Sequence, residues 1–401
     1  MTRLAIVGVP RNEHTLVEAI LQARVRGWEV ALVDKRAALD ACSAPAGAQL
    51  IALERSDAVV ATDTLSDFSP DLVVSFSEFN LLLAAEIRGL LGLPGPSSGA
   101  VRRTRCKHAT RQRLSEQCLT RAAFAVTTLA DLDATLSRFE PPFVIKPASM
   151  TGSIGVHAVR HRDDVAAFKD RFVSWEAEAA RDRAFVVESF LPGEEYSVEG
   201  ICHGGSFHLI TVTAKRTDGF PTFAETGHIL PARDCPAVDF AGFIGRVTAA
   251  LELDATPIHA EVKVHGGAIE LIEIHARFGG DLIPLLIRKA LGYDVFGAYY
   301  DSLLGKTPPA PQPSLAVAGV RFLHAGDLDA VIPSQLSGPV GYCLRVDAAN
   351  PRGAERDADN IRVLNPRIGH VLFTAGGHDA AETFFAKLGP ERRTTDAGRA
   401  A

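Results

Sequence analysis

The segment IHAEVKVHGGAIELIEIHARFGGD, residues 258–281, gives the strongest indication of the fold. Polar and apolar residues alternate on both sides of Gly266–Gly267, which predicts two β-strands joined as a hairpin, because successive side chains of a strand point to opposite faces. Glu261 then lies on one face of the first strand and Glu273 on one face of the second. The hairpin is therefore expected to carry acidic side chains above an apolar reverse side.

The length of the turn decides whether the two glutamates meet. A two-residue turn at Gly266–Gly267 would place Glu261 opposite Ile272, whereas a three-residue loop at 266–268 would place Glu261 opposite Glu273. We expect the longer loop, because only that register puts both carboxylates side by side.

Two bare carboxylates about 5 Å apart repel each other, and a divalent cation removes that cost. Oxygen ligands suit Mg²⁺, with Mn²⁺ as a possible substitute, so Glu261 and Glu273 are predicted metal ligands. Arg277 follows on the same strand face and could hold a phosphoryl oxygen. The alternative is a surface hairpin with scattered charge.

A second segment, FVIKPASMTGSIGV at 143–156, is a strand followed by a glycine-rich loop and another strand. Glycines let backbone N–H groups approach a phosphate closely, and a lysine at the strand end adds a point charge. The alternative is a hairpin with a flexible tip. The predicted phosphate contacts are Lys146, Ser149, Thr151, Gly152 and Ser153.

A third segment, FVVESFLPGEEYSVEGICHGG at 185–205, places glutamates at a strand–loop junction. Such carboxylates can accept hydrogen bonds from an exocyclic amine or from ribose hydroxyls, and the backbone could read the edge of a base. An ordinary solvated loop is the alternative. The predicted contacts are Glu188, Ser189, Phe190, Leu191 and Glu195.

The rest of the chain fits a multidomain α/β protein. Apolar strands alternate with helices over residues 1–95, which predicts a parallel sheet, and the first turn, GVPRNE, lacks the glycines of a dinucleotide-binding fingerprint. A basic helix is expected at 102–119. We expect an N-terminal α/β domain at 1–95, a catalytic domain at 96–310 with a mobile lid at about 120–187, and a β-rich C-terminal domain at 311–401 with a disordered tail.

Composition narrows the functional class. The 401 residues carry a formal net charge of −6, which disfavours a nucleic-acid partner. We find no signal peptide and no apolar run of the roughly 20 residues that cross a membrane, and the six cysteines form no CxxC pair. A cytoplasmic enzyme acting on small molecules is the expectation, with a homodimer possible.

In this order, these segments resemble the ATP-grasp superfamily over about residues 90–300. The resemblance implies an ATP-grasp fold in which Lys107 and Lys146 hold the phosphates of ATP, the 149–155 loop closes over them, Glu188 meets the adenine side and Glu195 the ribose. It also implies that Glu261 and Glu273 bind Mg²⁺ and that Arg277 stabilises the transferred phosphoryl group. His275 stands where the family often has asparagine, which leaves the third metal ligand open.

Residues 213–232 resemble the substrate-side loop of bacilysin-type L-amino acid ligases in the segment Glu225–Pro231, and Ala276–Gly280 resembles the segment that follows the metal glutamate in that group. This implies a ligase that activates a carboxylate as an acyl phosphate and joins it to an amine, with amino-acid-like substrates. His228 or His275 could accept the amine's proton, and nothing in the sequence chooses between them. The alternatives are a purine-biosynthesis-type carboxylase and a catalytically dead nucleotide-binding protein.

Overall fold

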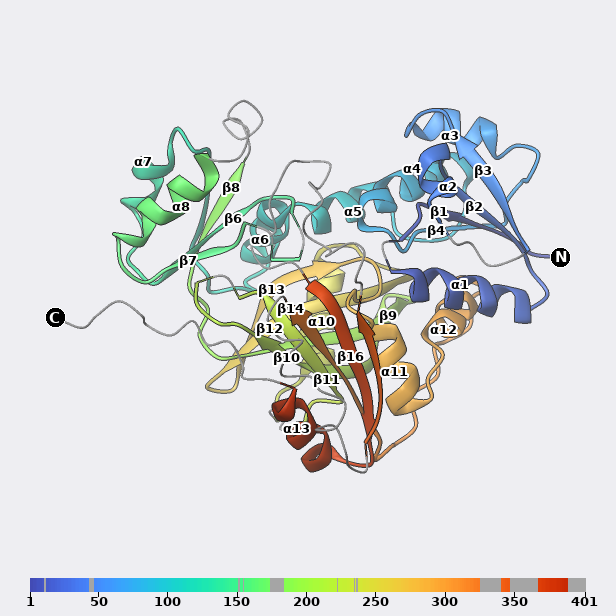
Figure 1. Cartoon of the computed structure of the whole chain (residues 1–401). Helices are drawn as coiled ribbons and strands as arrows, with labels where there is room; N and C mark the ends of the chain where they lie inside the picture. Colours follow the sequence, from blue (N-terminus) through green and yellow to red (C-terminus); the bar gives the residue numbers. More distant parts are fainter. Residues whose placement is uncertain are drawn as a thin grey trace.

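The computed structural model describes the chain except for residues 11, 43–46, 151, 154, 174–183, 222, 234, 236, 325–339, 347–366 and 389–401. The described residues form one eight-stranded sheet and two four-stranded sheets. Figure 1 shows the two smaller sheets at opposite ends above the large one. Along the described part of the chain, no helix combines the length and the apolar character that a membrane crossing requires. The predicted tail at the C-terminus lies outside the described residues.

The N-terminal sheet is parallel, as predicted, in the order β3-β2-β1-β4. Its strands are fully apolar in the middle because helices cover both faces. The elements are β1 (Arg3–Val7), α1 (Glu13–Val25), β2 (Glu29–Lys35), α2 (Arg36–Asp40), β3 (Ala48–Leu53), α3 (Ala58–Thr64), β4 (Leu72–Val74), η1 (Glu78–Asn80) and α4 (Leu81–Leu91).

The predicted basic helix is two helices, α5 (Ser98–Arg105) and α6 (Lys107–Glu116), so the expectation of one continuous helix over 102–119 was wrong. Cys106 is extended between them, with φ −115° and ψ 104°. The break lets the backbone N–H of Lys107 leave the helical ladder and donate to Ala148 O at 2.8 Å. Lys107 is thereby fixed to the start of the glycine-rich loop.

The second four-stranded sheet, in the order β5-β8-β6-β7, is antiparallel and separate from the others. Helices α7 (Leu132–Leu136) and α8 (Asp164–Val173) pack on it around Phe143, Phe168 and Phe185. It carries the glycine-rich loop between β6 and β7. Its strands are β5 (Phe124–Thr127), β6 (Phe143–Pro147), β7 (His157–Val159) and β8 (Phe185–Ser189).

The large sheet is antiparallel throughout, in the order β13-β12-β9-β10-β11-β14-β16-β15. Helix α10 (Phe240–Ala250) covers one face with an apolar core. The C-terminal strands continue this sheet, and α13 (His378–Lys387) packs beside them. The strands are β9 (Glu194–His203), β10 (Ser206–Thr217), β11 (Glu225–Leu230), β12 (Thr256–His265), β13 (Ala268–His275), β14 (Val317–His324), β15 (Gly341–Val346) and β16 (Arg367–Ala375).

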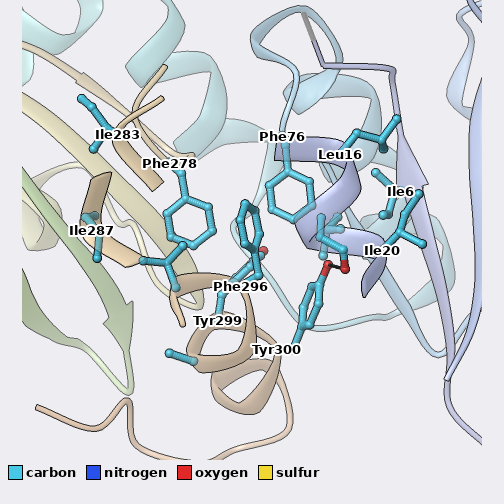
Figure 2. Close-up of a cluster of buried hydrophobic side chains, with 14 of the residues drawn as sticks. Ile6, Leu16, Ile20, Phe76, Phe278, Ile283, Ile287, Phe296, Tyr299 and Tyr300 are labelled. Carbon is cyan, nitrogen blue, oxygen red and sulfur yellow. Dashed lines mark hydrogen bonds between the residues drawn. The ribbon is translucent and has the colours of Figure 1, made fainter. Parts of the chain in front are cut away.

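An aromatic core joins the N-terminal sheet to α11 (Ile283–Leu291) and α12 (Val295–Leu303), as Figure 2 shows. The ring of Phe76 lies 6.1 Å from that of Phe278 and 5.3 Å from that of Phe296. Phe76 follows β4, so this packing also fixes the next residues of the N-terminal layer against the large sheet. The result is that Glu78 of η1 reaches the polar face of that sheet.

Candidate active site

The hairpin β12–β13 brings Glu261 directly opposite Glu273, as expected. The predicted three-residue loop, however, was wrong: His265 pairs with Ala268, so the turn holds only Gly266 and Gly267, with φ values of 55° and 78°. A β-bulge further along the hairpin brings Glu261 opposite Glu273 despite the short turn. In this bulge Ile272 is an extra residue between the pairs Val262–Leu271 and Glu261–Glu273.

Both glutamates line the same open pocket. The pocket brings together most of the side chains predicted from three separate segments. Ser149 and Gly152 lie in the loop nearby but do not line it, and Thr151 lies outside the described residues. The lining residues are Lys107, Val144, Lys146, Pro147, Met150, Ser153, Val156, Glu188, Ser189, Phe190, Leu191, Glu195, Phe223, Glu261, Lys263, Ile272 and Glu273.

Each glutamate of the hairpin pair already faces an ammonium group. Glu273 Oε2 is 2.8 Å from Lys107 Nζ, and Glu261 Oε2 is 2.9 Å from Lys215 Nζ. Burial alone would raise the pKa of Glu261, but Lys215 and His259 together outweigh it and lower that pKa to about 2. The two carboxylates are therefore ionised and drawn to positive charge, which is the donor set that a divalent cation with oxygen ligands needs.

Lys215 was not predicted as a site residue, and it is the most connected cation of the site. Its buried Nζ lies 2.9 Å from Glu195, 3.0 Å from Glu225 and 2.9 Å from Glu261. Burial would lower its pKa, but the three carboxylates raise it well above the usual range, so the ammonium stays charged. Alternation along β10 places Lys215 on the same face of the sheet as Thr211 and Thr213. This alternation is the sequence pattern from which Lys215 could have been predicted.

Glu188 has a different environment from the one expected. Its carboxylate is 3% exposed, accepts from Nε and Nη2 of Arg111 at 3.1 Å each, and lies 2.8 Å from Lys146 Nζ. Burial would raise the pKa of Glu188, but Lys146 and Arg111 lower it to about 2. Glu188 thus holds Lys146 toward the pocket, which Glu188 also lines, and its contact with the adenine side stays a prediction.

The far end of the pocket is aromatic. The rings of Phe190 and Phe223 are 6.0 Å apart, and Lys263 Nζ lies 4.6 Å and 4.9 Å from their centres. The backbone N–H of Ser189 donates to Ala123 O and that of Phe190 donates to Pro142 O, so neither is available to read a base edge as predicted. Flat apolar walls at this end suit a stacked base.

His275 and Arg277 are organised by a residue that was not predicted, Glu78. Glu78 Oε2 is 3.1 Å from His275 Nδ1 and accepts from Arg277 Nε at 2.6 Å. The other ring nitrogen of His275, Nε2, is 3.2 Å from Glu273 Oε1. Burial would raise the pKa of Glu78, but His275 and Arg277 hold it far below the usual range. His275 thus supports Glu273 from behind.

His228 does not line the pocket. It lies on β11. The resemblance to L-amino acid ligases predicted a loop for this segment, but the segment is a strand. Its Nε2 is 3.4 Å from Asp281, whose carboxylate accepts from Arg367 Nη2 at 3.1 Å, and the same guanidinium nitrogen is 3.2 Å from Glu225. These four residues, Glu225, His228, Asp281 and Arg367, are called the β11 cluster below. Lys215 links the β11 cluster to Glu261.

Comparison with known proteins supports a family. A sequence model described as an ATP-grasp domain matches residues 139–284. Alanine–anticapsin ligase of Bacillus subtilis is 26% identical over 269 residues, 61% of this chain and 56% of that one. Dapdiamide A synthase of Enterobacter agglomerans is 31% identical over 162 residues, 38% and 37% of the two chains. The matched region thus spans about half or less of these two relatives.

A longer match is phosphoribosylamine–glycine ligase of Phenylobacterium zucineum, 29% identical over 321 residues, 72% of this chain and 74% of that one. Among solved structures, an L-amino acid ligase from Bacillus licheniformis has a TM-score of 0.71 at 21% identity, over 97% of both chains. The ADP complex of purK, an N5-carboxyaminoimidazole ribonucleotide synthetase, has a TM-score of 0.72 at 16% identity, over 96% of both.

The two structural matches show the fold, and the ATP-grasp model falls on most of the segments that line the pocket. Residues 139–284 contain Lys146, the glycine-rich loop, Glu261 and Glu273. Residues 139–284 therefore match an ATP-grasp domain, and carboxylate–amine ligases are among the proteins to which the chain is similar.

Proposed function

We propose that the protein is an ATP-dependent ligase that joins a carboxylate to an amine through an acyl phosphate and releases ADP and phosphate. Amino acids or close analogues are the proposed substrates. One observation carries the proposal: Lys107, Lys146, Glu261 and Glu273 line a single pocket, with the two glutamates opposite each other. Cations and paired acids at one end of a pocket suit a nucleotide triphosphate with its metal.

In this proposal the nucleotide lies along the pocket. Its base stacks at Phe190 and Phe223, Glu195 accepts from the ribose, and Lys107 and Lys146 hold the phosphates. Mg²⁺ or Mn²⁺ would be held by Glu261 and Glu273 and would neutralise charge on the phosphate oxygens. Lys107 and Lys215, which pair with those glutamates here, would then turn toward the phosphates.

The chain's remaining groups suit the two chemical steps. The substrate carboxylate attacks the terminal phosphorus in line, and Arg277, held at Nε by Glu78, offers its guanidinium to the developing negative charge. An amine then displaces phosphate from the acyl phosphate. The candidate acceptors for the amine's proton are His228, whose Nε2 faces Asp281, and His275, both of whose ring nitrogens face carboxylates. Closure of the β5-β8-β6-β7 sheet over the pocket would keep water from the acyl phosphate.

A purine-pathway ligase is the second candidate, and the long match to phosphoribosylamine–glycine ligase favours it.

A phosphate-release screen tests the proposal. Pairs of amino acids, bicarbonate, and glycine with phosphoribosylamine are offered with ATP and Mg²⁺, and products are identified by mass. We expect ADP and an amide product from particular amino acid pairs. Product only from phosphoribosylamine and glycine, or carboxylation only with bicarbonate, would assign the chain to purine chemistry. Nucleotide binding with no acid-dependent ADP release would indicate a protein that binds ATP without catalysis.

A further inference from the structure

Behind Glu261 lies a buried ion pair for which the reaction described so far has no use. His259 is two residues before Glu261 on β12 and pairs across the ladder with Glu199 of β9. His259 Nδ1 is 2.6 Å from Glu199 Oε1, and His259 Nε2 is 3.4 Å from Glu261 Oε1. The three side chains thus form a line from the interior of the sheet to the pocket, and only Glu261 lines the pocket.

We propose that Glu199 and His259 are a positioning pair that fixes the orientation of the Glu261 carboxylate for the metal-bound nucleotide. The inference rests on the proposed role of Glu261 as a metal ligand. Glu199 fixes the plane of the imidazole through Nδ1, and Nε2 then faces one oxygen of Glu261. Partners of this kind, one bond removed from a metal, keep a ligand in a single orientation.

His259 cannot take part directly. It is 6% exposed, and both ring nitrogens face carboxylates. The backbone of Gly279 covers the pair: a Cβ built there would lie 2.9 Å from His259 Nδ1 and 3.2 Å from Glu199 Oε2. No substrate atom can reach the ring past this cover, so its influence must pass through Glu261.

The opposite strand repeats the arrangement, which argues against an accident of packing. His275 links Glu273 to the partly buried Glu78 as His259 links Glu261 to Glu199. The two imidazole rings stack with centres 5.8 Å apart and planes 26° apart. Each glutamate of the hairpin pair therefore has an imidazole behind it, and each imidazole has its own carboxylate.

Glu199 and His259 place charge in the interior of the protein, where apolar side chains would pack at a lower cost in free energy. Glu199 is 1% exposed, and among the described residues its Oε2 has no hydrogen-bond partner. A carboxylate in such a place costs free energy unless it serves orientation or function. A role in holding the ring of His259, and through it Glu261, accounts for its position.

The test measures metal binding rather than turnover. Binding of Mn²⁺ to the full-length protein saturated with ADP is followed by electron paramagnetic resonance and calorimetry for wild type, His259→Asn, Glu199→Gln and Glu261→Gln. The matched control is His203→Asn, a histidine on β9 away from the pocket. We expect His259→Asn to weaken Mn²⁺ by about 10- to 100-fold and Glu199→Gln by somewhat less. His203→Asn should bind like wild type, and the Mn²⁺ spectrum should change only in the first three variants.

The double variant His259→Asn/Glu261→Gln decides whether the effect passes through Glu261. We expect it to bind Mn²⁺ no more weakly than Glu261→Gln alone; additive losses would overturn the inference, as would wild-type Mn²⁺ affinity in His259→Asn. If Glu261→Gln itself binds Mn²⁺ normally, the metal assignment of the proposed function fails instead. Should His259→Asn not fold, judged by thermal unfolding, Glu199→Gln and its double variant with Glu261→Gln are read by the same criteria.

Discussion

The nucleotide pocket and the β11 cluster differ in how their charges are used. In the pocket, Lys107, Lys146 and Glu273 come from different sheets and helices and face a common open space. In the β11 cluster, Arg367 pairs with both Asp281 and Glu225, and Lys215 connects Glu225 to the pocket. The first arrangement is ready to receive a highly charged ligand. The second can discriminate between ligands, because any substrate group that enters must replace a contact already made.

The largest effect should come from the acid pair. Glu273→Gln should lower the rate of ADP formation by at least about 100-fold, since it removes a charge that balances the metal at the transferred phosphoryl group. Coupled detection of ADP, with circular dichroism to check folding, measures it. The control is Glu194→Gln, an exposed carboxylate at the start of β9. Near-normal ADP formation by Glu273→Gln would remove the metal site from the pocket.

Lys146→Met should weaken nucleotide binding by roughly 10- to 100-fold, because a charge-assisted contact to phosphate is lost and Glu188 keeps only Arg111. Calorimetry with ADP reports the affinity directly. Lys169→Met changes a partly exposed lysine of α8, which packs on the same four-stranded sheet that carries Lys146. This variant should leave ADP affinity unaltered. Equal affinities for Lys146→Met and wild type would contradict the phosphate role.

Asp281→Asn sharpens the comparison, because it should separate the two regions. We expect the KM for the amine to rise by about tenfold, as Arg367 and His228 lose a charged partner, while ADP affinity stays within about twofold of wild type. Product and ADP are quantified together. A parallel loss of ADP affinity would mean that the cluster and the pocket are one site.

The smallest effect concerns pH. The pKa of Glu188 is lowered from 4.5 to about 2 by Lys146 and Arg111 against the opposing effect of burial. The folded state therefore binds this proton less readily than the unfolded state, so the ion pairs stabilise the fold above about pH 4.5 and that contribution is lost as pH falls toward 2. Urea midpoints across this window should fall in the wild type and fall less steeply in Glu188→Gln. Parallel curves would show that Glu188 is not what titrates.

Local patterns were enough to locate the pocket but not to describe its contacts. Residues within one strand or loop, such as Lys146 and Glu195, follow from alternation and glycine content. The charged partners of Lys215, Glu78 and Arg367 lie far away in the sequence. Sequence periodicity does not indicate which distant charged side chain each of them will contact. The pairing of Glu188 with Arg111 was not predicted for the same reason, since Arg111 lies on a different element.

The hairpin register shows a signal that was present and overlooked. In AIELIEIH, Leu271 and Ile272 are adjacent apolar residues in an otherwise alternating strand, which is what a β-bulge requires. The two-glycine turn was equally visible, since Gly-Gly is typical of two-residue turns. Together they give the observed register without a longer loop.

The bulge lets neighbouring residues, Ile272 and Glu273, face the same pocket, which a regular strand never does. Ile272 behaves as an insertion: excising it would leave Glu273 still opposite Glu261 but would strip a hydrophobic surface from beside the acid pair. Within this one hairpin, affinity for the nucleotide's apolar part and affinity for metal therefore depend on different residues. A change at Ile272 alone would alter the affinity for the apolar part and leave the affinity for metal unchanged.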